Sequence, residues 1–301
     1  MQPSHAVQRP NTRLAFLAGF TMIAITAVQF VAARFSLRAD LTAVDVASLR
    51  FAGAALAFIP ILGWTGSARL RALGWRRALV LACLVGLPYP ILINWGLTHA
   101  PATHAAALCP ASIVFFSFLL ARFAFKETIT SRRLIGIALI IGGLVLFILP
   151  SLSGMSGVLF GDLLFVGSGI MFASYGLLVR HWNIESVTAT AAISLLSCLP
   201  LPGLHFLAPS GLATASATEI VAQLVIQGLL AGAAAIFLYT YAVRQLGPQI
   251  ASLFLPCVPV ATAFTGMIVL GEVPGLLQFI AMLIMTAGMV LPVLLKGNGK
   301  S

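Results

Sequence analysis

The sequence has 301 residues, of which 60% are hydrophobic and 8% are charged. A soluble domain carries roughly 25% charged residues, so this composition excludes a soluble globular protein and predicts an all-α polytopic membrane protein. The formal net charge of +10 does not indicate a nucleic-acid partner, because lysine and arginine gather on the cytoplasmic loops of membrane proteins.

The first predicted element is an apolar stretch from Leu14 to Ala33, which follows a short polar segment. A run of about 20 apolar residues spans a bilayer, so we expect a retained transmembrane helix and no cleaved signal peptide. Similar stretches recur along the chain, separated by short connections that often carry proline or glycine. The ten predicted helices cover residues 13–34, 42–63, 78–98, 102–123, 133–150, 158–180, 186–207, 219–242, 248–270 and 274–295.

The basic residues predict how these helices are oriented. With the N-terminus in the cytoplasm, most of the 17 lysine and arginine residues lie on cytoplasmic segments, whereas Arg34 and Arg38 lie outside and Arg50 lies within a span. We therefore expect both termini in the cytoplasm and a location in the inner (plasma) membrane. The cytoplasmic set is Arg9, Arg13, Arg69, Arg71, Arg76, Arg77, Arg122, Lys126, Arg132, Arg133, Arg180, Arg244, Lys296 and Lys300.

The two halves of the chain, residues 1–150 and 151–301, resemble each other. Moving from Glu127 to Glu272, or from Gly143 to Gly288, is the same shift along the sequence. Each half holds five predicted helices, and because five is odd the second copy is inverted in the membrane. Glu127 is then expected on the cytoplasmic side and Glu272 outside. Inverted repeats around a shared site are typical of secondary transporters and predict alternating access around a central cavity.

Several segments resemble the EamA family of the drug/metabolite transporter superfamily. In the second half, Pro259 precedes the pair Gly271 and Glu272, as in the family pattern, whereas the first half has Val114 and Lys126 at the matching positions. The segments that carry the resemblance are LRFAGAAL (49–56), ALCPASIVFFSFLLARFAFKE (107–127), GDLLFVGSGIMFASYGLLVR (161–180) and LFLPCVPVATAFTGMIVLGE (253–272).

The resemblance implies a basket of ten helices, arranged as two inverted five-helix repeats, that exports small metabolites. Bacterial amino-acid exporters, including exporters of aromatic amino acids, are the members most similar in size and layout. Exporters of other small metabolites or drugs, and a non-carrier channel, are the alternatives. An enzyme is not expected, because the chain has no HExxH motif and no nucleophile elbow.

Polar and aromatic side chains within the spans are the candidates for binding substrate, since such residues are costly in a bilayer. The repeat places Gln29 opposite Tyr175 and Asn94 opposite Tyr239. Other roles remain open: Gln29 can simply link two helices, Trp95 can belong to the interfacial aromatic belt, and Ser112 can bond its own backbone. The candidate set is Gln29, Tyr89, Asn94, Trp95, Ser112, Tyr175 and Tyr239.

Prolines interrupt the third, fourth and ninth predicted helices. Each removes a backbone donor and disturbs the preceding turn, so these positions are candidates for helix breaks and gating. A static kink is the alternative interpretation. The prolines concerned are Pro88, Pro90, Pro110, Pro256 and Pro259.

The ionisable residues within or near the spans bear on the substrate and on coupling. Arg50 attracts a substrate carboxylate, pairs with Asp45 or snorkels outward. His104 can titrate and sense external pH, but a helix start in water is the preferred interpretation. So few fixed charges favour zwitterionic amino acids with apolar side chains over phosphates. Asp162, like the other acidic residues, is predicted near a span end, which leaves proton coupling and facilitated diffusion both open.

No cofactor or metal is expected. The four cysteines, Cys83, Cys109, Cys198 and Cys257, lie in apolar segments and match no metal-ligand spacing. We expect a monomer whose partners are a small-molecule substrate and the lipid bilayer.

Overall fold

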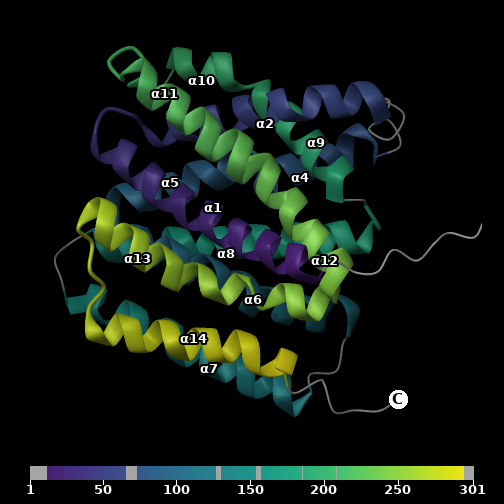
Figure 1. The fold of residues 1–301 in the computed structure, drawn as a ribbon, viewed down its shortest axis with the longest axis vertical. Helices are drawn as coiled ribbons and strands as arrows, with labels where there is room; N and C mark the ends of the chain where they lie inside the picture. Colours follow the sequence, from purple (N-terminus) through teal and green to yellow (C-terminus); the bar gives the residue numbers. More distant parts are fainter. Residues whose placement is uncertain are drawn as a thin grey trace, which may run out of the picture.

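The computed structural model describes residues 12–65, 73–126, 130–153, 157–184, 186–207 and 209–294, apart from the side chains of residues 58–65, 153, 186–187 and 248–249. Glu127 and the predicted cytoplasmic residues Arg9, Arg69, Arg71, Lys296 and Lys300 lie outside the described residues. Throughout the described chain the regular elements are helices, which run side by side in one bundle (Figure 1). The predicted all-α fold is confirmed.

The first half of the chain forms five spans. The third of them consists of two helices, α4 and α5, which are separated by a short break at Gly86 and Leu87 and together run from Trp75 to His99. The helices are α1 (Thr12–Arg38), α2 (Ala43–Thr65), α4 (Trp75–Val85), α5 (Pro88–His99), α6 (Ala102–Phe125) and α7 (Ser131–Ser153).

The second half is more interrupted. Its third span changes from α-helix to a π-helical segment and back, and its fourth begins with a short 3-10 turn. The elements are α8 (Val158–His181), α9 (Ser186–Cys198), α10 (Leu201–Leu207), α11 (Ala217–Gln223), η1 (Leu224–Ala234), α12 (Ala235–Ser252), η2 (Leu255–Cys257), α13 (Val258–Leu270) and α14 (Leu276–Leu294).

Nine segments of the described chain are long and apolar enough to cross a membrane. Helix α2 adds a tenth long helix of 23 residues, about 34 Å at 1.5 Å per residue, against a hydrocarbon core of about 30 Å. The chain is thus a multi-pass membrane protein.

Close helix crossings join the two halves. Helix α2 packs on η1 where two glycines meet: a Cβ atom added to Gly53 would lie 2.5 Å from the carbonyl oxygen of Leu224, and one added to Gly228 would lie 2.5 Å from the Cα of Gly53. Small residues let membrane helices approach closely, and dispersion contacts then hold them together. Helix α7 packs on α14 in the same way, with Gly143 against Met285.

A central cavity closed at one end

A cavity of about 460 Å³ lies between helices from both halves of the chain. This volume is in the range typical of sites for small molecules. Among its lining residues are Met22, Thr26, Gln29, Phe30, Arg50, Phe51, Tyr89, Pro90, Ile93, Asn94, Leu97, Cys109, Pro110, Ile113, Phe172, Tyr175, Thr190, Ser194, Gln227, Tyr239, Thr240, Leu255 and Val258.

Arg50 is the only lysine, arginine or acidic residue among those lining residues. Its Nη1 donates a hydrogen bond to Oε1 of Gln29, at 3.1 Å, across the gap between α2 and α1. Arg50 therefore bonds Gln29 and not Asp45, which was one of its predicted alternatives. A guanidinium has five N–H donors, so the pair leaves donor capacity for an anionic ligand.

Two buried amides hold this part of the wall in place. Nε2 of Gln227, on η1, donates to the backbone oxygen of Gln29 at 2.8 Å. Nδ2 of Asn94 donates to the backbone oxygen of Ala43 at 3.3 Å. Both amides fix helices through backbone carbonyls, which are the partners that polar side chains find in a bilayer.

Aromatic side chains form another part of the wall. The ring of Phe172 lies between Tyr89 and Tyr175, with ring centroids 5.6 Å and 5.5 Å away. Tyr239, from α12, lines the same cavity. Such rings supply a broad apolar surface with a few hydroxyl groups.

The cavity brings together five of the seven side chains proposed for substrate binding: Gln29, Tyr89, Asn94, Tyr175 and Tyr239. The other two lie elsewhere. Trp95 is 48% exposed on the outside of the bundle, where its ring packs on Phe160 at 5.3 Å. Ser112 is fully buried in the α6–α8 contact, against Gly169.

The five prolines also divide. Pro90 and Pro110 line the cavity, Pro88 starts α5 after the break, and Pro256 and Pro259 lie at η2 and at the start of α13. Each of these prolines lies at a helix break or in the first turn of a helix, except Pro110, which lies inside α6. The kink at Gly247, where φ is 80°, precedes Pro248 and lies between the predicted helices 219–242 and 248–270. Sequence reasoning missed the π-helical segment η1, which contains no proline.

At one end of the bundle, the left side in Figure 1, α1 finishes and the α5–α6 and α13–α14 connections meet. We call it the Glu272 end. Glu272 accepts hydrogen bonds from Arg34 Nε at 3.0 Å, from Arg38, and from the backbone N–H of Ala102 at 2.9 Å. Arg34 also donates to the carbonyl oxygen of Leu97. This Glu272 cluster ties α1 to α5, α6 and the loop before α14.

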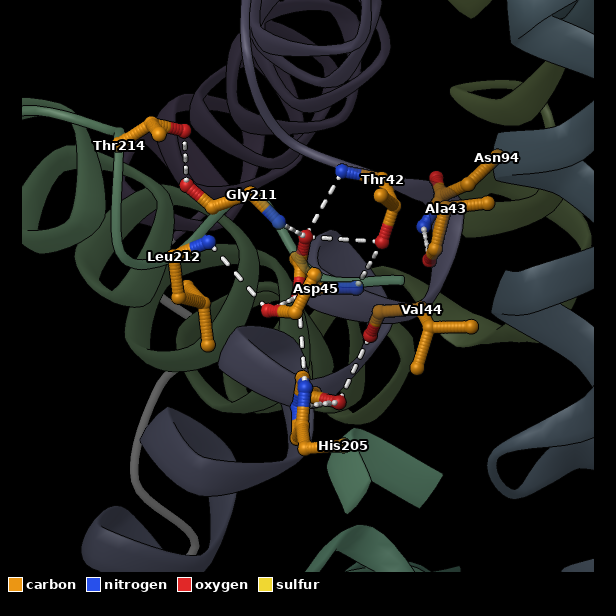
Figure 2. A network of polar contacts seen from close by, with 11 residues as sticks. Thr42, Ala43, Val44, Asp45, Asn94, His205, Gly211, Leu212 and Thr214 are labelled. Carbon is orange, nitrogen blue, oxygen red and sulfur yellow. Dashed lines mark hydrogen bonds and ion pairs between the residues drawn. The ribbon is translucent and has the colours of Figure 1, made fainter. Parts of the chain in front are cut away.

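A second cluster at the same end surrounds Asp45, in the first turn of α2 (Figure 2). Its carboxylate accepts from the backbone N–H and hydroxyl of Thr42 at 2.9 and 2.8 Å, from Ser210 Oγ at 2.7 Å and from Gly211 N–H at 2.8 Å. His205 Nδ1 lies 3.4 Å away. This Asp45 cluster attaches the loop before α11 to α2.

A third cluster joins α6 to α8. His104 is 2% exposed, so the prediction of a histidine in water is wrong, because α7 and α14 cover the start of α6. Its Nδ1 lies 2.6 Å from Oδ1 of Asp162, whose Oδ2 accepts from Ser151 Oγ at 2.8 Å. Its Nε2 lies 2.9 Å from Nε2 of Gln278. We call these four residues the His104 cluster.

The other end of the cavity has a different character. Lining residues near the Glu272 end, such as Ala33, Asn94 and Leu97, are buried, whereas Tyr175 and Tyr239 at the opposite end are partly exposed and Leu255 is 39% exposed. The cavity is thus closed at the Glu272 end and more open where α8 finishes.

Comparisons with known proteins place this architecture. A model of the EamA-like transporter family matches residues 13–149 and again residues 159–294. A protein of Streptantibioticus cattleyicolor described as a probable terminal-alkyne amino-acid exporter is 28% identical over 282 residues, which cover 89% of this chain and 91% of that protein. A solved crystal structure aligns with a TM-score of 0.64 and 17% identity, over 95% of this chain and 98% of the other; this likeness concerns the fold alone.

Proposed function

Since the chain belongs to the EamA-like transporter family and is a small-molecule exporter, we propose that it exports amino acids with apolar or aromatic side chains by alternating access. The observation that carries the proposal is a single guanidinium, Arg50, among described lining residues that otherwise carry no lysine, arginine or acidic side chain and that include aromatic rings. The related exporter described for amino acids supports the same substrate class.

Substrate recognition follows from the chemistry of the wall. The carboxylate binds Arg50, because an arginine holds a carboxylate through charge-assisted hydrogen bonds. The ammonium group is held by acceptors that the cavity offers, of which Oε1 of Gln29 lies nearest the guanidinium. The side chain packs on Tyr89, Phe172 and Tyr175. Phosphates and nucleotide sugars fit less well, since they need several cations.

Alternating access uses the asymmetry of the cavity. We propose that repeats 1–150 and 151–301 rock about it, with both termini in the cytoplasm of a cell whose inner membrane holds the protein as a monomer. The open end then faces the cytoplasm, where an exporter loads its substrate, and the three polar clusters close the outer side.

The first experiment is counterflow in proteoliposomes with a panel of labelled amino acids. We expect saturable exchange of phenylalanine, leucine or valine. Transport of a phosphate ester with no transport of any apolar amino acid would contradict the substrate class, and flux that does not saturate would indicate a channel.

The role of Arg50 is tested by the substitution Arg50→Gln. We expect KM for the transported amino acid to rise about 10- to 100-fold, corresponding to about 1.5–3 kcal/mol for a hydrogen bond to a charged group. The methyl ester of the same amino acid has no carboxylate and is expected to compete only weakly for transport. If Arg50 binds the carboxylate, Arg50→Gln leaves this weak competition by the ester unchanged. Arg50→Lys, which keeps the charge, is the matched control and loses less.

Orientation is tested by single cysteines in a cysteine-free background. A cysteine at Asp40, exposed just beyond α1, is expected to react with an impermeant maleimide in intact cells. A cysteine at the exposed Arg76 is expected to react only after permeabilisation. The reverse pattern would overturn the proposed orientation.

A further inference from the structure

The His104 cluster contains a buried titratable pair, His104 and Asp162, which lies outside the cavity lining. Asp162 is fully buried and His104 nearly so, and both lie among helices rather than at a surface. An ionisable pair in the membrane-spanning part of a transporter is costly to keep there, so it calls for an explanation.

The hydrogen bonds define where the protons are. Oε1 of Gln278 accepts from the backbone N–H of Gly275 at 3.0 Å, which orients the amide so that its NH₂ group faces Nε2 of His104. Nε2 therefore acts as an acceptor, and the imidazole proton is on Nδ1, donated to Asp162. In this arrangement the histidine is neutral, the carboxylate is ionised, and the pair carries one negative charge.

The Asp45 cluster shows what a permanently ionised carboxylate looks like in the same protein. Asp45 is held by two backbone N–H groups and two hydroxyls, which keep their protons over the physiological range, and the more distant Nδ1 of His205, at 3.4 Å, is only one further partner. Asp162 has one hydroxyl, from Ser151, and one imidazole N–H. Its stabilisation thus depends on an imidazole, which can hold a second proton on its other ring nitrogen.

The described groups around the pair offer no competing partner that would take a proton from it. Helix α7 contributes Ser151 and the ring of Phe147, 4.8 Å from the imidazole, and α14 contributes the uncharged Gln278. At the start of α6, the N–H of Ala102 is bonded by Glu272 from the loop before α14, and this carboxylate is paired with Arg34 and Arg38. On the α5 side, His99 bonds Thr98 and the carbonyl oxygen of Trp95 instead of Asp162.

We propose that His104 and Asp162 form a proton-binding site that couples export to the proton gradient; the inference rests on the proposed transport function. One proton from the outer water binds the pair when the Glu272 end is open and cancels its negative charge. The proton leaves to the cytoplasm in the opposite state. Each cycle thus moves one proton inward for one zwitterion outward, and it carries one positive charge inward.

The pair is connected to the cavity by the helices that bear it. Further along α6 and α8, Cys109 Sγ and Ser168 Oγ lie 3.3 Å apart, and Ser112 packs against Gly169. Pro110 and Phe172, next along the same two helices, line the cavity. A change in charge at the outer end therefore acts on two walls of the site.

The test uses proteoliposomes with an acidic interior and labelled phenylalanine outside. For one-proton exchange at zero membrane potential, a gradient of one pH unit supports accumulation of up to about tenfold. Asp162→Asn and His104→Gln are expected to abolish this accumulation while counterflow at equal pH persists. His99→Gln changes a histidine at the same end whose described hydrogen bonds go to Thr98 and Trp95, and this matched control retains coupling.

Three results would overturn the inference: wild-type accumulation that ignores the gradient, a folded Asp162→Asn protein that still accumulates phenylalanine, or a folded one that has lost counterflow as well. If Asp162→Asn does not fold, His104→Gln decides. If the wild type shows no counterflow, the proposed function fails. Proton uptake by the purified protein then decides separately whether His104 and Asp162 bind a proton. On acidification from about pH 8 to about pH 5, the wild type must bind about one proton more than His104→Gln.

Discussion

The two ends of the central cavity are built from different interactions. At the Glu272 end, three polar clusters link α1, α2, α6 and α8 to segments far away in the sequence. At the opposite end the lining consists of partly exposed aromatic and hydroxyl side chains such as Tyr239 and Thr240. Ion pairs and hydrogen bonds close one end specifically, whereas loosely covered side chains leave the other end accessible.

This difference between the two ends indicates how one end of a transporter can be closed by contacts that are able to open again. The clusters lie near helix ends, where water can replace each partner once a cluster opens. The same groups at mid-membrane would have no such replacement, since an unpaired charge in hydrocarbon is costly. The proposed alternating access requires reversible closure, which polar clusters at helix ends allow.

The largest expected effect comes from removing the carboxylate of the Glu272 cluster. Glu272→Ala leaves Arg34 and Arg38 without their shared partner and the N–H of Ala102 without its acceptor. Breaking such a buried pair costs about 3–5 kcal/mol, enough to shift a two-state equilibrium by about 100-fold or more. A single cysteine at Ala33, buried in the cavity wall, should then react much faster with an impermeant maleimide from outside.

Asp40→Asn is the control for that experiment, because it removes an exposed carboxylate at the same end. It should leave the labelling rate unchanged. Equal labelling in Glu272→Ala and the parent protein would show that the Glu272 cluster does not hold this end closed.

A smaller effect is expected from the Asp45 cluster. Asp45→Asn replaces an ionised acceptor of four hydrogen bonds and should lower the free energy of unfolding by about 2 kcal/mol. Thermal unfolding of the purified protein in detergent measures this. Ser210→Ala, which removes one of the four donors, should cost about half as much, and the comparison fails if both variants melt like the parent.

At the open end, Tyr239→Phe removes one hydroxyl from the cavity wall and keeps the ring. We expect KM in counterflow to change by no more than about tenfold, which corresponds to about 1.4 kcal/mol. Tyr239→Ala, which also removes the ring, should cost more. A larger rise in KM for Tyr239→Phe than for Tyr239→Ala would mean that the hydroxyl, and not the aromatic surface, binds the substrate.

The smallest effect is expected from Arg38→Gln. Arg38 is 44% exposed, and exposed ion pairs contribute about 0–1 kcal/mol, while Arg34 keeps its own bond to Glu272. Labelling at Ala33 should rise only slightly. An effect as large as that of Glu272→Ala would show that Arg38, rather than Arg34, dominates the closure.

The sequence by itself determined that this is a helical membrane protein with ten spans and a family resemblance to exporters. Composition, apolar run length and proline–glycine connections are local properties, and the bilayer converts them directly into helices because every backbone group must find a partner within its own segment. Glu272, Arg34 and Arg38 were likewise predicted on one side of the membrane from the number of helices between them.

Only the tertiary structure decided which side chains meet. Tyr89 and Trp95 belong to one helix and carry similar sequence signals, yet one lines the cavity and the other is exposed on the outside of the bundle, because neighbouring helices cover one face of α5 alone. Arg50 donates a hydrogen bond to Gln29 and not to Asp45. Asp162, which was predicted near a span end, lies buried beside His104. Burial and partnership of this kind depend on how separate helices pack, which no single segment encodes.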